Sequence, residues 1–297
     1  MTTDTRTITF LQTTDAEFRA WVADIIDQLN DIGLTQTSDT GQIDTVTVNR
    51  PGATNTQAGY AVFRFNDTQQ TNAPIFIKVG FGTGAATTTP SIWITVGKNT
   101  DGAGTLSNII RIQLQRQITA GASSIPSHAC YDADLGSLWA VWGSSWTTNA
   151  VATLMVMRSC ELDGTPNSGG VLTNWTQAVA AFTITNVHTL VITAVNPFAL
   201  TANTSNYVGP YWEDGFPVVW VSNGYIDAAH SSRPDDQGFC IFPGLYGCLL
   251  ADFAPLNEVT VELDGVDHNY MAFTVSGGVI QQLDAHGSGT RALLLWE

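Results

Sequence analysis

The hydrophobic and polar positions of residues 15–32 follow the period of an α-helix. Apolar side chains recur there every three or four residues, at Phe18, Trp21, Val22, Ile25, Ile26, Leu29 and Ile32. Charged and amide side chains, among them Arg19, Asp24, Asp27, Asn30 and Asp31, occupy the opposite face, so we expect an amphipathic helix with one buried face. Its predicted core residues are Phe18, Trp21, Val22, Ile25 and Leu29. Thr14 and Glu17 have the spacing of a capping box, and Gly33 is the expected helix stop.

The other segments of the first 121 residues have the alternation and turn signals of short strands. The predicted strands are 7–11, 45–49, 59–65, 75–80, 91–97 and 109–118. A lone amphipathic helix needs a sheet to cover its apolar face. We therefore expect residues 1–121 to form a small α+β unit, with one amphipathic helix packed on an antiparallel sheet.

Residues 121–127 are small and polar, and we interpret them as a linker or a long loop. Beyond them the predicted strands are 137–143, 152–158, 182–184, 188–194, 216–221, 239–242, 259–263, 271–275 and 290–295. Long connections separate some of them, at 196–217 and 222–238, and no fixed period is visible. This pattern favours a β-sandwich-like unit with long loops over residues 127–297, and the expected fold class is mainly β.

The composition points away from nucleic acids and membranes. Charged residues make up 12% of the chain, Lys78 and Lys98 are its lysines, and the formal net charge is −15. An acidic surface repels phosphate backbones, so we expect no nucleic-acid partner. The first ten residues lack the basic and apolar parts of a secretory signal, and no apolar run reaches 18 residues. We expect a soluble protein made in the cytoplasm, with no membrane insertion.

The cysteines offer no recognised metal or disulfide pattern. Cys130, Cys160, Cys240 and Cys248 contain no Cys-x-x-Cys unit, and we favour buried thiols, with pairing of Cys240 and Cys248 left open. The segment 128–134 alternates His, Cys, Asp and Asp, which would share one face of a strand and could bind a cation. It precedes a predicted strand and lacks the spacing of a zinc or calcium loop, so we interpret it as a loop. No cofactor is predicted.

Enzyme signatures are missing from the sequence. No serine lies in a Gly-x-Ser-x-Gly elbow, and the chain contains neither a Gly-x-Gly-x-x-Gly motif after a strand nor a Walker loop. The paired carboxylates Glu213-Asp214 and Asp235-Asp236 could serve a glycosidase, but acidic turn residues are the simpler interpretation. We expect a protein that is not an enzyme.

Aromatic residues give the candidate contact site. Tyr and Trp side chains cluster beside two acids in a predicted loop, where they could stack on sugar rings or contact a partner; the candidates are Tyr207, Tyr211, Trp212, Glu213, Asp214 and Tyr225. Trp139 and Trp142 have opposite parity. Both can be core residues only if their strand is buried on both sides or lies in an interface.

Several segments together resemble the virion structural proteins of tailed bacteriophages. They are the helical opening, GYAVFRFND, APIFIKVGFG, PSIWITVGKNTDGAG, SLWAVWGSSW and LMVMRSCELDGTP, which span roughly residues 7–165. The resemblance implies a non-enzymatic viral protein, made in the cytoplasm of the bacterial host and built in multiple copies into the virion.

The resemblance also implies partners, namely other virion proteins and copies of the chain itself in a homo-oligomer. We favour a tail protein, such as a tail appendage, fibre or tip component, which mediates assembly and contacts a glycan of the host surface. A capsid decoration (cement) protein is one alternative. A carbohydrate-binding or glycan-depolymerising module is the other.

Overall fold

The structure is a computed structural model, and it describes most of the first half of the chain and separate strands beyond it. The described segments are residues 1–118, 126–143, 151–160, 166–177, 181–182, 207–213, 216–222, 245–248, 258–263, 266–275 and 291–296. This part of the chain is mainly β and contains one helix, as the hydrophobic pattern predicts. The described helix is not long and apolar enough to cross a membrane.

Helix α1 (Asp15–Asp31) begins and ends where its capping signals predict. The Glu17 backbone N–H donates to Thr14 Oγ1 at 3.2 Å, and Glu17 Oε2 accepts from the Thr14 N–H at 3.0 Å. Gly33 follows the C-cap with a φ of +100°, a conformation that costs glycine little. All five residues predicted for the core face, Phe18, Trp21, Val22, Ile25 and Leu29, are buried.

Five strands form an antiparallel sheet in the order β2-β3-β4-β5-β6, which we call the β4 sheet after its central strand. Its strands are β2 (Thr35–Gln36), β3 (Gln57–Arg64), β4 (Phe76–Thr83), β5 (Pro90–Thr100) and β6 (Leu106–Gln117). Four of them correspond to predicted strands, but the strand predicted at 45–49 is wrong. Asp44 accepts there from the Val46 N–H at 2.8 Å and from Thr47 Oγ1 at 2.6 Å, and these local bonds hold a turn.

A second antiparallel sheet, which we call the β7 sheet, has the strand order β1-β7-β8-β9-β10. Its strands are β1 (Thr2–Thr7), β7 (Pro126–Asp132), β8 (Ser137–Gly143), β9 (Val151–Cys160) and β10 (Pro166–Gln177). The loop interpretation of residues 128–134 is therefore wrong over most of its length. Residues 126–132 become a strand because β1 and β8 pair with them on both sides. The first strand lies at 2–7 rather than at the predicted 7–11.

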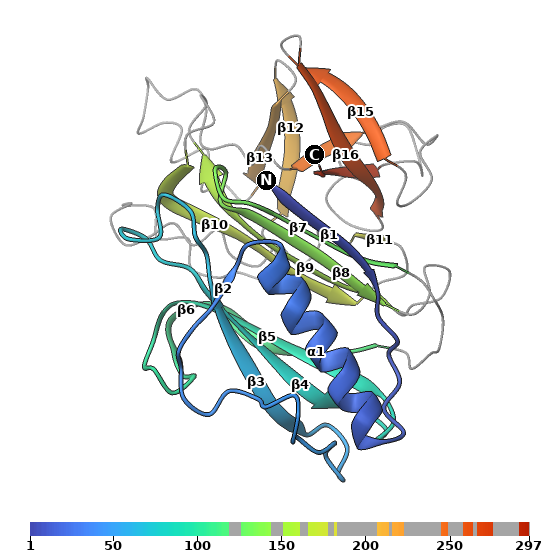
Figure 1. The fold of residues 1–297 in the computed structure, drawn as a ribbon. Coiled ribbons are helices and arrows are strands. Elements are labelled where there is room, and N and C mark those ends of the chain that lie inside the picture. Colours follow the sequence, from blue (N-terminus) through green and yellow to red (C-terminus); the bar gives the residue numbers. More distant parts are fainter. Residues whose placement is uncertain are drawn as a thin grey trace.

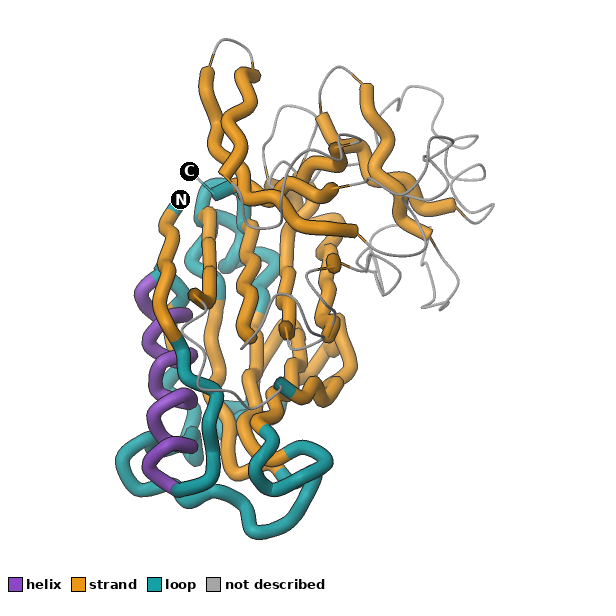
Figure 2. Tube along the Cα trace, turned by 90° about the vertical axis from the view of Figure 1, so that its right-hand side faces the viewer, coloured by secondary structure: helices purple, strands orange, loops and turns teal. Residues whose placement is uncertain are grey.

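The two sheets and α1 share one hydrophobic core. Figure 1 shows α1 running along one side of the two sheets, and Figure 2, turned by 90°, shows it at the margin of the strands. At another edge, β6 contacts β10. The ring centroid of Trp21 in α1 lies 5.8 Å from that of Phe81 in the β4 sheet. The ring centroid of Phe65, which follows β3, lies 5.0 Å from that of Tyr131 in the β7 sheet. The helix thus fills a space between sheets that are joined elsewhere.

The predicted division of the chain at residues 121–127 stays a prediction. Two structural features cross it. Strand β1 belongs to the same sheet as β7, and the core cluster contains residues such as Val22 and Phe63 from one side and Trp142 and Leu154 from the other. Any fragment that ends before β7 would lack the strands on which this core depends.

The later strands form a hairpin and a further sheet. The hairpin is β12 (Tyr207–Glu213) with β13 (Phe216–Ser222), and the sheet contains β11 (Ala181–Phe182), β14 (Leu245–Cys248), β15 (Glu258–Leu263), β16 (Val266–Val275) and β17 (Arg291–Leu295). Strand β11 is parallel to β16, whereas the other pairs are antiparallel. Part of the long connection predicted at 196–217 is therefore a strand. The strands predicted at 188–194 and 239–242 lie outside the described residues.

Candidate functional site: the polar junction of β1, α1 and β7

The predicted aromatic site is only partly described. Tyr207, Tyr211, Trp212 and Glu213 lie on β12, where Tyr211 is opposite Val218 and Trp212 is opposite Pro217. Asp214 and Tyr225 lie outside the described residues. The structure places four of the six candidates on one strand of a hairpin, and their role as a contact surface stays a prediction.

The opposite parity of Trp139 and Trp142 has a structural explanation. All seven residues of β8 are buried, so the strand is covered on both faces. On one side Trp142 Nε1 donates to Gln28 Oε1 of α1 at 2.8 Å. On the other side the Trp139 ring lies 5.3 Å from the Trp296 ring, near the end of the chain. Of the two possibilities raised by the sequence, burial on both faces within one chain is the one observed.

The cysteines and the alternating acidic segment do not form a metal cluster among the described residues. Cys130 is buried on β7, Cys160 and Cys248 lie on β9 and β14, and Cys240 is outside the described part. No group of three or more His, Cys, Asp or Glu side chains with the geometry to hold an ion occurs in the segments that the structure describes.

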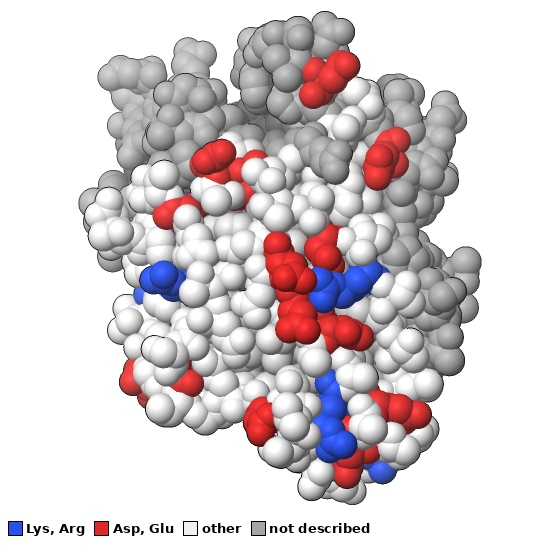
Figure 3. All heavy atoms as spheres, viewed as in Figure 1, with Lys and Arg blue, Asp and Glu red and all other residues white. Residues whose placement is uncertain are grey.

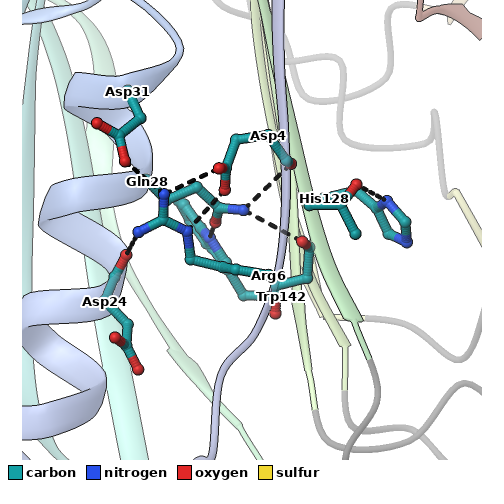
Figure 4. Close-up of polar contacts among 9 residues, drawn as sticks. Asp4, Arg6, Asp24, Gln28, Asp31, His128 and Trp142 are labelled. Carbon is teal, nitrogen blue, oxygen red and sulfur yellow. Dashed lines mark hydrogen bonds and ion pairs between the residues drawn. The ribbon is translucent and has the colours of Figure 1, made fainter.

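Several polar contacts between separate elements gather where β1 passes α1. Figure 4 shows the Arg6 side chain of β1 extended toward the helix. Its Nε and Nη2 atoms lie 2.6 Å and 2.9 Å from the two carboxylate oxygens of Asp4. Nη2 also lies 2.6 Å from Asp31 Oδ2, and Nη1 donates to the Asp24 carbonyl at 3.3 Å. The planar guanidinium suits this task because its donors form a rigid fork.

The charges at this junction change the pKa values of its acids. Burial alone would raise the pKa of Asp4, but the hydrogen bonds and the charge of Arg6 lower it below the usual range. The hydrogen bonds that Arg6 donates to Asp4 raise the pKa of Arg6, which stays protonated. Burial raises the pKa of Asp24, whose carboxylate points away from Arg6 in Figure 4. In the region of α1 and β1, Figure 3 shows blue atoms of basic side chains lying beside red atoms of acidic ones.

Gln28 is the buried centre of the junction. Its Nε2 atom donates to the Ser127 carbonyl of β7 at 3.1 Å and lies 3.4 Å from the Asp4 carbonyl of β1, while its Oε1 accepts from Trp142. A fully buried amide is stable only when its donors and acceptor have partners. One side chain thereby ties α1 to three strands of the β7 sheet. The sequence contained a signal for this role, because Gln28 interrupts the apolar face of the helix between Ile25 and Leu29.

His128 lies beside this junction on β7. Its Nδ1 atom is 3.0 Å from Thr5 Oγ1 of β1, and its ring centroid is 5.6 Å from that of Trp296. The side chain is 8% exposed, and burial lowers the pKa of His128 to about 4, against a smaller opposing effect of Asp4. Neutral imidazole is therefore the form that the folded protein favours at pH 7.

The side chains of Arg6, Gln28 and His128 each contact a second element, and together these contacts attach β1 to α1 and β7. Comparison with known proteins adds no homologue: no family model matches the chain, and no curated protein or solved structure is significantly similar to it.

Proposed function

We propose that the protein is a non-enzymatic structural subunit of a tailed-bacteriophage virion, present in multiple copies and associated with the tail. The observation that supports this proposal is the placement of the cationic side chains. Among the lysines and arginines whose side chains are described, Arg64 alone is exposed. The others are half-buried or buried, and most of them bind the chain's own loops and strands.

Three contacts illustrate this internal use. Lys78 Nζ donates to the Gly104 carbonyl at 2.7 Å and lies 4.0 Å from the centroid of the Tyr60 ring. Arg19 donates to the carbonyl of Val48 at 3.1 Å, which fixes a loop against α1.

Arg50 also binds the chain's own backbone and side chains, at the start of α1. Its guanidinium donates to the Gln12 carbonyl at 2.7 Å, and its backbone N–H donates to the Asp15 carboxylate at 3.0 Å. The long cationic side chains thus bind other parts of the same chain, and short uncharged side chains such as threonine remain on the surface.

Such a surface suits repeated assembly. Ordering a free lysine or arginine at an interface costs roughly 1.5–2 kcal/mol of side-chain entropy, whereas threonine and serine lose much less. Copies of one subunit that meet through closed symmetry form many identical contacts, so a small saving at each contact is multiplied. This argument supports a homo-oligomeric particle component, and the resemblance described above supports its phage character.

The mass of the purified full-length chain in solution tests the proposal. Light scattering should give a discrete multiple of the 31.8 kDa chain mass, and negative-stain images should show a ring or a symmetric cluster of the same size. The variant Thr2→Lys with Thr7→Lys replaces two exposed threonines of β1 and leaves the core unchanged. It tests whether added lysine side chains on the surface weaken assembly. A monomer at every concentration, in the parent chain as well as in this variant, would contradict the multi-copy subunit and favour the decoration or carbohydrate-binding alternatives.

A further inference from the structure

Strand β5 carries a large aromatic side chain on the face of the β4 sheet that is turned away from the core, which we call the outer face. Ile92 and Ile94, on either side of Trp93 along the strand, are fully buried in the core. Successive side chains of a strand point to opposite faces, so the Trp93 indole lies on the outer face. It is half-buried, and part of its surface therefore contacts solvent.

Amide side chains lie beside Trp93 across the sheet. The residue opposite Trp93 is Gly80 on β4 and Gln115 on β6, and residues opposite each other in a sheet share a face. A Cβ atom at Gly80 would lie 2.6 Å from Gln57 Nε2. The missing side chain therefore makes room for the Gln57 amide on the outer face, and Trp93 has a glutamine on each side.

Hydrogen bonds join one of these amides to an uncharged polar cluster. Gln115 Nε2 lies 3.2 Å from Ser91 Oγ, 3.2 Å from Asn55 Oδ1 and 3.1 Å from the Thr83 carbonyl oxygen. Asn55 is exposed, and its backbone N–H donates to the Gly84 carbonyl at 2.8 Å, which holds its turn against the sheet. Primary amides both donate and accept hydrogen bonds, so the cluster contains both kinds of group.

Acidic residues are missing from the long strands of this sheet. The sequences of β3, β4, β5 and β6 contain no Asp or Glu, although the whole chain has 26 acidic residues and a formal net charge of −15. Lys78, two residues before Gly80, binds the Gly104 carbonyl at 2.7 Å. A ligand at Trp93 therefore meets an aromatic ring, amides and a hydroxyl from these strands, and no carboxylate.

We propose that the outer face of the β4 sheet around Trp93 binds an uncharged oligosaccharide. A sugar ring has an apolar C–H side, which packs on a flat aromatic ring, and hydroxyl groups that donate and accept hydrogen bonds. Amide and hydroxyl side chains match these groups without a charge, and an aromatic surface with a few polar groups is typical of ligand sites. The site is separate from the aromatic residues of β12, and the proposal does not depend on the function proposed above.

Calorimetric titration of the full-length protein with oligosaccharides tests the proposal. The probes are hexasaccharides of glucose, mannose, galactose and N-acetylglucosamine, and a hexamer of galacturonic acid is the charged comparison. At least one uncharged probe should bind, and the acidic hexamer should bind more weakly because the chain carries a large negative charge. Absence of binding by all uncharged probes, or equally strong binding of the acidic hexamer, would overturn the proposal.

Variants locate the site on the outer face. Trp93→Ala should weaken binding at least about tenfold, the loss expected for an aromatic anchor. Asn55→Gly removes an exposed amide at a φ of +51°, which glycine adopts readily, so it should fold and weaken binding about threefold or more. Asn108→Gly, also exposed and with a φ of +48°, is the matched control and should bind like the parent chain.

The same variants distinguish a sugar site from a contact between copies of the chain. Binding that is unchanged in Asn55→Gly and in a folded Trp93→Ala would overturn the proposal. Light scattering of Trp93→Ala gives the second measurement. A smaller particle mass than that of the parent chain, with sugar binding unchanged, would assign the outer face to self-association instead.

Discussion

Two arginine clamps in this molecule use the same chemistry in different surroundings. Arg158 of β9 binds Asp67, which follows β3, and the two side chains are 1% and 0% exposed. Arg6 of β1 binds Asp31 of α1, and these side chains are 21% and 63% exposed. The first clamp joins the β7 sheet to the loop between β3 and β4 inside the molecule. The second joins β1 to the helix at the surface.

The geometry of the inner clamp explains why its loss should be severe. Arg158 Nε and Nη2 lie 2.6 Å and 3.1 Å from the two oxygens of Asp67, and the guanidinium lies 6.0 Å from the centroid of the Phe65 ring. Water cannot replace a partner removed from this site. At the outer clamp, water can solvate either group, so the ion pair there contributes little to stability. The difference between the two clamps comes from solvent access.

The largest predicted effect is at the inner clamp. Replacing the acid in Asp67→Ala leaves the Arg158 charge buried without a partner, and should lower the free energy of unfolding by about 3–5 kcal/mol. Urea denaturation followed by circular dichroism measures this loss. The double variant Asp67→Leu with Arg158→Met removes both charges and should recover most of the stability. A single variant within 1 kcal/mol of the parent would show that water reaches the site.

An intermediate effect is expected for Arg6→Met, which keeps much of the apolar stem and removes the guanidinium. The change deletes charge-assisted hydrogen bonds to Asp4 and Asp31, and should cost about 1–2 kcal/mol because the group is partly solvated. Arg6 lowers the pKa of Asp4, so this stabilisation is present above the ordinary carboxylate pKa and is lost as pH falls below it. The difference in unfolding free energy between parent and variant should therefore shrink in acid. A difference that is constant from pH 7 to pH 2 would contradict this origin.

The smallest effect is expected for Asp31→Asn, which removes only the exposed partner of Arg6. The expected cost is below about 1 kcal/mol, since the carboxylate is largely solvated and Asp4 still binds the guanidinium. Thermal unfolding at low and high salt measures it, and the difference from the parent should decrease in high salt. A loss as large as that of Asp67→Ala would mean that the two clamps are equivalent, which their exposure argues against.

The sequence was informative where structure depends on neighbouring residues. The ends of α1 follow from Thr14, Glu17 and Gly33, because capping bonds form within a few residues. Strand β8 spans residues 137–143 as predicted, since its apolar run is bounded by turn residues. Local chemistry also misled the prediction at 45–49, where alternation indicated a strand but Asp44 forms a turn.

The sequence was less informative where a strand depends on distant partners. Strand β7 has few signals of its own, and it becomes a strand because β1, more than a hundred residues away, pairs with its edge. The candidate site shows the same limit. The sequence highlighted the aromatic residues of β12, whereas the junction of Arg6, Gln28 and His128 is built from residues that are separated along the chain and meet only in the fold.

The sequence by itself determined the mainly β class, the position of the single described helix and the residues of its buried face. Those features follow from hydrophobic periodicity and capping, which act over one or two turns. Tertiary structure decided that β1 pairs with β7, that β8 is buried on both faces, and that one arginine clamp is dry while the other is wet. These outcomes depend on which distant segments exclude water from one another, and that information is not carried by any local pattern.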